Sequence, residues 1–227
     1  MLVLTFVTGV IDAIGYLGLD RVFAGNMTGN VVILGLGLAG ADELPVLGPA
    51  VALGGFLAGA ALAGRALRHS PRGTWTATCT WVLVACAVVL GAVAVLLLFE
   101  ERFAPQLVAP GAACLMAIGM GAQASTARRL AVQEVTTVVV TSTLTGLAAD
   151  SRFAGGGSPL WARRAGAVLA ITAGAATGAL LLLAHLTAGV TAAAVLTLAV
   201  AARGHYSVGV RSRRKSPSSP TTQTHAR

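Results

Sequence analysis

Long apolar stretches, separated by short polar ones, run along most of the chain. Residues 76–99, 107–122, 160–184 and 186–202 carry almost no charge. A helix needs about 20 apolar residues to cross a bilayer, and it satisfies its own backbone N–H and C=O groups without water. None of these stretches alternates apolar and polar residues, as the strands of a membrane barrel do. The pattern predicts an all-α integral membrane protein.

The second half of the chain resembles the first half when the sequence is shifted by 113 residues, so that Thr28-Gly29-Asn30 falls on Thr141-Ser142-Thr143. Matching segments at a fixed offset indicate an internal repeat. Each half has a first helix (2–19, 107–126), a segment rich in Thr or Asn (23–40, 136–149), a long helix (45–66, 160–183) and a last helix (76–99, 186–203). We therefore predict a first membrane repeat (1–104), a second membrane repeat (105–205) and a basic, disordered cytoplasmic tail (206–227).

The positions of the basic residues decide whether the Thr/Asn-rich segments cross the membrane. If they do not, the chain has six spans and 14 of its 16 Lys and Arg residues lie on one side. If they do, the eight-span split is 10 against 6. Cytoplasmic loops carry the excess of Lys and Arg, so we expect six transmembrane helices and cytoplasmic termini. Three spans per half make the two repeats inverted, each with an extra polar re-entrant or broken helix.

Two groups of polar residues lie within the apolar pattern. Asp12 falls in the middle of the first helix, where an ionisable group costs about 2.5–3.5 kcal/mol to insert. One interpretation is functional: Asp12 relays a proton or cation, or contacts a substrate. The other is structural: its side chain forms a hydrogen bond between helices. The stretch Asn26-Met27-Thr28-Gly29-Asn30 either opens a half-helix whose N-terminus points into the bundle, or holds an ordinary Asn N-cap.

Polar residues recur in register in the second half, where Thr141 aligns with Thr28 and Thr143 with Asn30. Gln123 lies near the end of the fourth span, and Ser125 aligns with Asp12. We predict a substrate-binding site at the membrane midplane between the repeats. Its residues are Asp12, Asn26, Thr28, Gly29, Asn30, Gln123, Thr141 and Thr143.

Several other functions find little support in the residues. The net charge of +8 lies in loops and the tail, and no nucleic-acid-binding motif accompanies it. The cysteines and histidines show no metal-ligand spacing, and no paired-carboxylate, nucleophile–base or P-loop arrangement is present. We therefore expect no enzymatic activity, no cofactor and no metal. Gly55 and Gly59, like Gly174 and Gly178, form G-x-x-x-G pairs that serve bundle packing or, alternatively, a homo-oligomer interface.

The same polar motifs resemble a known family. Thr8-Gly9-Val10-Ile11-Asp12 with the later Asn26–Asn30 stretch, and Gly119–Gln123 with Val140–Gly146, are similar to the YoaK-like bacterial membrane proteins, a family of unknown function. The resemblance covers residues 2–203, although Ser142 stands where the family is expected to have Gly and Ala124 where it is expected to have a polar residue. It implies a small polytopic protein of the bacterial inner (plasma) membrane, and it implies no activity.

The inverted repeat, with polar residues in matching register, favours a small-solute transporter or permease-like protein. The chain has no ATP-binding motif, so transport would be passive or ion-coupled. The alternative is a non-transporting membrane scaffold or accessory subunit. In either case the expected surroundings are the lipid bilayer, and the solute is unidentified.

Overall fold

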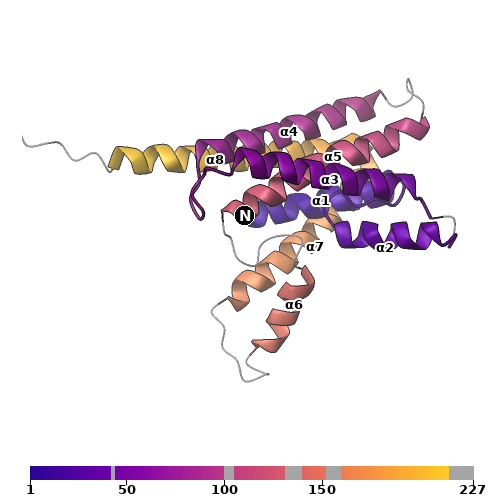
Figure 1. Cartoon of the computed structure of the whole chain (residues 1–227), viewed down its shortest axis with the longest axis horizontal. Coiled ribbons are helices and arrows are strands. Elements are labelled where there is room, and N and C mark those ends of the chain that lie inside the picture. Colours follow the sequence, from indigo (N-terminus) through magenta and orange to yellow (C-terminus); the bar gives the residue numbers. More distant parts are fainter. Residues whose placement is uncertain (42–43, 100–104, 131–139, 152–159, 215–227) are drawn as a thin grey trace, which may run out of the picture.

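The computed structural model describes residues 1–41, 44–99, 105–130, 140–151 and 160–214, and within these ranges every regular element is a helix (Figure 1). Each of the eight segments expected from the sequence contains one. The helices are α1 (Leu2–Gly18), α2 (Met27–Leu38), α3 (Leu47–Ala66), α4 (Ala77–Leu98), α5 (Pro105–Arg129), α6 (Val140–Ala149), α7 (Trp161–Ala184) and α8 (Leu186–Arg214). The all-helical prediction is confirmed for these residues.

Five helices of the described chain are long and apolar enough to cross a membrane: α3, α4, α5, α7 and α8. The apolar helix α1 has 17 residues, which gives it a length of about 25 Å. The helices α2 and α6 are shorter still, with 12 and 10 residues. The fold is therefore that of a helical membrane protein whose first helix is short for a span.

The six longest helices run in alternating directions through the bundle. Met1 packs with Leu67, Trp75 and Leu130, so the start of α1 meets the end of α3, the approach to α4 and the end of α5. At the same end Ala201 of α8 packs with Leu4 and Leu83. Hence α1 and α4 begin at this end, which we call the Met1 end, while α3, α5 and α8 finish there. The nearest neighbour of Gly166 in α7 is Leu2, so α7 also begins at the Met1 end.

Each half of the chain packs on the other in the same way. The most extensive helix contacts join α3 with α5 and α1 with α7, followed by α4 with α8 and α4 with α5. The short helices lie outside this core: α2 packs on α3, and α6 packs on α7, where Figure 1 shows it below the main stack. A shift of four elements therefore converts one half's contacts into those of the other.

Glycines set the distance between the paired helices. A Cβ on Gly59 would press on the Ile118 carbonyl, and one on Gly174 would press on the Phe6 carbonyl. Gly55 and Gly178 face the backbone of α5 and α1 in the same manner. Small residues allow such backbone approach in membrane helices. Both G-x-x-x-G pairs thus pack inside the bundle, which is the first of the two uses expected from the sequence.

The two glycine contacts also refine the repeat. Gly9 lies against Ile171 and Ala175, whereas Gly121 lies against Phe56 and Ala60. If these contacts are equivalent, α5 matches α1 at an offset of 112 residues, and α7 matches α3 at an offset of 115 residues, rather than both at 113. At the local offset Asp12 corresponds to Ala124 and not to Ser125. The short helices keep the original offset, because α2 starts at Met27 and α6 at Val140.

Part of the segment predicted to be a disordered tail is helical in the structure. Helix α8 continues to Arg214, so residues 206–214 are helical. Polar side chains do not end a helix by themselves, and this stretch holds neither Pro nor a Gly pair; the first Pro is residue 217. Residues 215–227 lie outside the described chain.

We predict that Gly59→Ala and Gly174→Ala each destabilise the protein by about 1–3 kcal/mol, because the added methyl group overlaps a backbone carbonyl. The measurement is thermal unfolding of the purified protein in detergent. Gly54→Ala and Gly91→Ala are the matched controls, since a Cβ at either position meets nothing within 4 Å. Equal melting temperatures for test and control variants would contradict the close packing.

Candidate functional site

The chain turns back on itself after α1. Asp20 and Arg21 adopt left-handed backbone angles, with φ of 60° and 56°, and residues 19–26 then run back along the helix they have just left. The Val22 N–H donates to the Gly15 carbonyl at 3.2 Å. We call residues 19–26 the returning segment. It carries the start of α2 from the end of α1 to the level of Thr8 and Asp12.

Two glycines permit this close return. A Cβ on Gly15 would overlap the Val22 carbonyl, and one on Gly25 would lie 2.6 Å from the Thr8 Cγ2 atom. The backbone of the returning segment therefore touches α1 directly. An extended backbone in an apolar interior leaves N–H and C=O groups that no helix satisfies, and each unpaired group is costly there.

Asp12 satisfies the inner end of the returning segment. Its Oδ1 atom accepts the N–H of Gly25 at 2.7 Å and the N–H of Asn26 at 3.3 Å. The N–H of Ala24 also interacts with this carboxylate. Consecutive backbone N–H groups of this kind form an anion-binding nest, here placed at the N-terminus of α2. Asp12 is only 7% exposed, so its carboxylate is held inside the bundle.

Asn30 satisfies the middle of the returning segment. Its Oδ1 accepts the Phe23 N–H at 2.8 Å, and its Nδ2 donates to the Phe23 carbonyl at 2.6 Å. The side chain is fully buried. The Phe23 ring in turn stacks on Tyr16, with centroids 4.9 Å apart, and a Cβ on Gly29 would lie 2.7 Å from that ring. Asn30 and Gly29 thus fold the returning segment onto α2.

Gln123 connects the second half of the chain to the same place. It is buried in α5, and its Nε2 donates to Thr8 Oγ1 at 3.2 Å and to the Leu4 carbonyl at 3.3 Å. Thr8 lies one turn before Asp12 on α1, so the two side chains share a face. We call Thr8, Asp12, Asn30 and Gln123 the buried polar cluster; Asn30 is linked to Asp12 only through the backbone of the returning segment.

Asn26 and Thr28 lie at the rim of this cluster. Both side chains are exposed in the isolated chain. Asn26 is the N-cap of α2, and its Oδ1 accepts the Gly29 N–H at 3.4 Å. The ordinary N-cap interpretation of Asn26 is thus confirmed. The capped end of α2 lies beside Asp12 of α1, whereas the half-helix interpretation stays a prediction.

Thr141 and Thr143 lie apart from the cluster, on α6. Thr141 is exposed, and its carbonyl accepts the hydroxyl of Thr145. Thr143 is 4% exposed and is the buried position of α6, as Asn30 is the buried position of α2. Helix α6 packs on α7, and within the described part of the chain neither hydroxyl contacts Asp12. The residues 131–139 that lead into α6 are outside the described chain.

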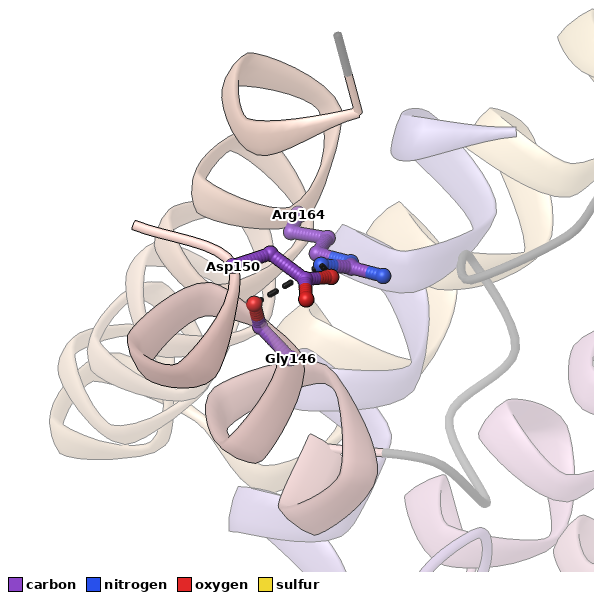
Figure 2. Close-up of polar contacts among 3 residues, drawn as sticks. All are labelled: Gly146, Asp150 and Arg164. Carbon is purple, nitrogen blue, oxygen red and sulfur yellow. Dashed lines mark hydrogen bonds and ion pairs between the residues drawn. The ribbon is translucent and has the colours of Figure 1, made fainter. Parts of the chain in front are cut away.

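A second anchor, which sequence reasoning missed, holds α6 to α7. Arg164 Nη1 donates to the Gly146 carbonyl at 2.7 Å and to Asp150 Oδ2 at 2.5 Å (Figure 2). A cation at a helix C-terminus is favourable, and here it is also buried. The neighbouring Arg163 is exposed. Asp150, just past the apolar run of α6, was the available sign.

Thr8 was also missed as a member of the cluster. It lies four residues before Asp12, a spacing that places both on one helix face, and this could have identified it. No group of three or more His, Cys, Asp or Glu residues that could hold a metal occurs in the described ranges.

Comparisons with known proteins now fix the family. A family model described as "Protein of unknown function (DUF1275)" matches residues 1–202. This chain belongs to the DUF1275 family. The DUF1275 chain is also 34% identical, over 147 residues, to the UPF0700 transmembrane protein YoaK of Bacillus subtilis (strain 168). The match covers 65% of this chain and 64% of that relative, so it spans slightly less than two thirds of either.

The YoaK-like resemblance seen in the sequence is therefore confirmed. No solved structure matches this DUF1275 chain. The relative's name describes it as transmembrane, which agrees with the apolar helices here, and the family description assigns no activity.

We predict that Asn30→Leu destabilises this DUF1275 protein by about 1–3 kcal/mol, because the N–H and C=O of Phe23 lose their partners inside the bundle. Thermal unfolding in detergent measures the loss. Thr28→Val is the matched control, since Thr28 is exposed two residues earlier on the same helix. The role given to Asn30 is wrong if both variants unfold at the temperature of the native protein.

Proposed function

We propose that this DUF1275 protein is a small-solute transporter of the bacterial plasma membrane, with six spans in two inverted three-helix repeats. The observation that carries the proposal is the returning segment, which delivers the capped N-terminus of α2 and a buried polar cluster to the middle of the bundle. Non-helical backbone at such depth is tolerated where it is buried in protein or lines a cavity, and transporters build their sites from broken helices of this kind.

The helix directions support the inverted repeat. In the order α1, α3, α4, α5, α7, α8 the helices alternate, so each helix of one half is antiparallel to its counterpart in the other. We count α1 as the sixth span although it is short. It runs parallel to α7 in glycine-lined contact, and a bilayer thins around a short span at modest cost.

The exposed charges support the orientation. The Met1 end carries exposed arginines from four helices or their ends, whereas Asp20 and Arg21 are the described charges beside the end of α1. Positive residues accumulate on the cytoplasmic side, so the Met1 end is cytoplasmic in this proposal. The exposed arginines are Arg65, Arg68, Arg72, Arg128, Arg163 and Arg203.

The difference between the two short helices fits a transport cycle. Asp12 holds α2 against α1, whereas Arg164 holds α6 against α7. An inverted-repeat transporter is asymmetric in any one state, because each half takes in turn the arrangement of the other. In the proposed cycle Thr141 and Thr143 reach the cluster when α6 takes the position that α2 now has.

The topology has a direct test. Single cysteines at Asp20, Ala39 and Arg72 are placed in a background without native cysteines and labelled with a membrane-impermeant maleimide in intact cells. The proposal expects Asp20 and Ala39 to react from outside, because α2 returns to the side it came from, while Arg72 reacts only after lysis. If Asp20 and Ala39 label from opposite sides, α2 is a true span and the inverted repeat is wrong.

Transport is tested in proteoliposomes challenged with urea, glycerol, glycine or acetate and followed by stopped-flow light scattering. We expect the native protein to raise the permeability to at least one of these solutes. Gln123→Leu should lower that rate about tenfold, since a buried polar group left unpaired costs 1–3 kcal/mol. Gly54→Ala, which contacts nothing, should keep it.

The second candidate is a non-transporting scaffold or accessory subunit. It gains support if no solute crosses faster than in protein-free vesicles and the protein copurifies with a stoichiometric partner. The internal use of both G-x-x-x-G pairs leaves those glycines unavailable for such a partner. We propose no catalytic step for either function.

A further inference from the structure

The buried polar cluster contains one carboxyl group, that of Asp12. Its other side chains, from Thr8, Asn30 and Gln123, are neutral. A carboxylate inside a membrane protein is usually paired with a cation or linked to ion movement. The surroundings of Asp12 therefore decide between a structural ion pair and a site that exchanges a proton.

No cation of the described chain lies within ion-pair distance of Asp12, since the ion pair present there joins Arg164 and Asp150. On α1, the titratable neighbour on the same face is Tyr16, whose ring stacks on Phe23. The returning segment contributes Asp20 and Arg21 at its outer turn. Helix α5 contributes Cys114 and, at the Met1 end, Arg128 and Arg129.

The two arginines of α5 do not pair with Asp12. Arg129 donates to the carbonyls of Ser70 and Arg68 at 2.7 Å each. Arg128 is exposed. Helices α7 and α8 contribute Arg163, Arg164, Arg203 and His205 at the Met1 end, and His185 at the opposite end, where α7 meets α8. The charge on Asp12 is thus stabilised by backbone N–H groups and the N-terminus of α2.

Those contacts are strongest with the ionised form, whose charge also faces the N-terminus of α2. A carboxylate accepts hydrogen bonds only, which matches the N–H groups of Ala24, Gly25 and Asn26. Adding a proton to one carboxyl oxygen creates an O–H donor among N–H donors and removes the charge that faces the helix N-terminus. We propose that Asp12 is a proton-binding site and that proton binding releases the returning segment and the start of α2 from α1.

The rest of the segment is built to move as one unit. The hydrogen bonds between Asn30 and Phe23 join the returning segment to α2. They therefore remain when the hydrogen bonds to Asp12 are broken. The outer turn holds two successive non-glycine residues, Asp20 and Arg21, in the left-handed region, and such strain is kept only while the surroundings impose it. Release from Asp12 lets this turn relax and act as the hinge.

This inference deepens the proposed transport function by naming a proton as the coupling ion. The release itself is a conformational event and is measured without any solute. Its test and the vesicle test can therefore fail separately. If the segment is released but no solute crosses, the proton site stands and the transport function is wrong. If solute crosses but the segment is not released, the transport function stands and the proton site is wrong.

The experiment follows the reactivity of a cysteine at Ala24, which is buried beside Asp12. Ala24→Cys is introduced into the full chain without native cysteines, reconstituted in vesicles, and labelled with a small maleimide between pH 5 and pH 8. Each rate is divided by the rate of Thr28→Cys in the same background, because Thr28 is exposed and thiol ionisation affects both. We expect the ratio to rise about tenfold as the pH falls.

The variants at position 12 decide the cause. Asp12→Asn mimics the protonated group and should give a high ratio at every pH, while Asp12→Glu should retain a pH-dependent ratio. Asp20→Asn, which removes the exposed carboxyl at the other end of the segment, should behave like the native protein. A ratio independent of pH in the native background overturns the proposal, and so does a pH response that survives Asp12→Asn.

Discussion

The structure depends on satisfying the backbone of the returning segment without water. Residues 19–26 are neither helix nor sheet, yet they lie along α1 with Asp12 and Asn30 as partners. Asp12 accepts the inner N–H groups, Asn30 pairs with both backbone groups of Phe23, and the Gly15 carbonyl takes the N–H of Val22. Because each of these bonds replaces hydration, losing one exposes a polar group to an apolar interior. The position of α2 follows from them.

The second constraint is backbone contact between the halves. Glycines on both sides of the α3–α5 and α1–α7 pairs bring carbonyls and helices together, so each half is completed by the other. Neither half buries its own first helix against its own third helix to a comparable extent. This exchange places Gln123 of α5 beside Thr8 of α1. The polar cluster is therefore a product of the crossed packing, built from residues of both halves.

Much of this fold was predictable, because apolar length, repeat register and charge placement are properties of the sequence. The helices and the Asn26 cap follow from such patterns. The partners of Asp12 do not, since a carboxyl four residues from Thr8 gives no sign that Gly25, 13 positions away, will donate to it. The Arg164–Asp150 ion pair could not be predicted for the same reason, because the sequence does not show that two residues 14 positions apart will meet. Helix offsets of 112 and 115 also depend on packing rather than on alignment.

The two anchors differ in what can undo them. Arg164 is a guanidinium, and one of its two contacts with α6 is the Gly146 carbonyl, which carries no titratable group, so this contact does not depend on pH. Asp12 carries a group whose charge depends on protons, and it meets its partners through backbone N–H groups that a side-chain rearrangement cannot replace. Under the proposed mechanism these two contacts give an order of events: α2 responds to protons first, and α6 follows only if the packing around α7 changes. That asymmetry is the physical reason to look for motion in the first half of the chain.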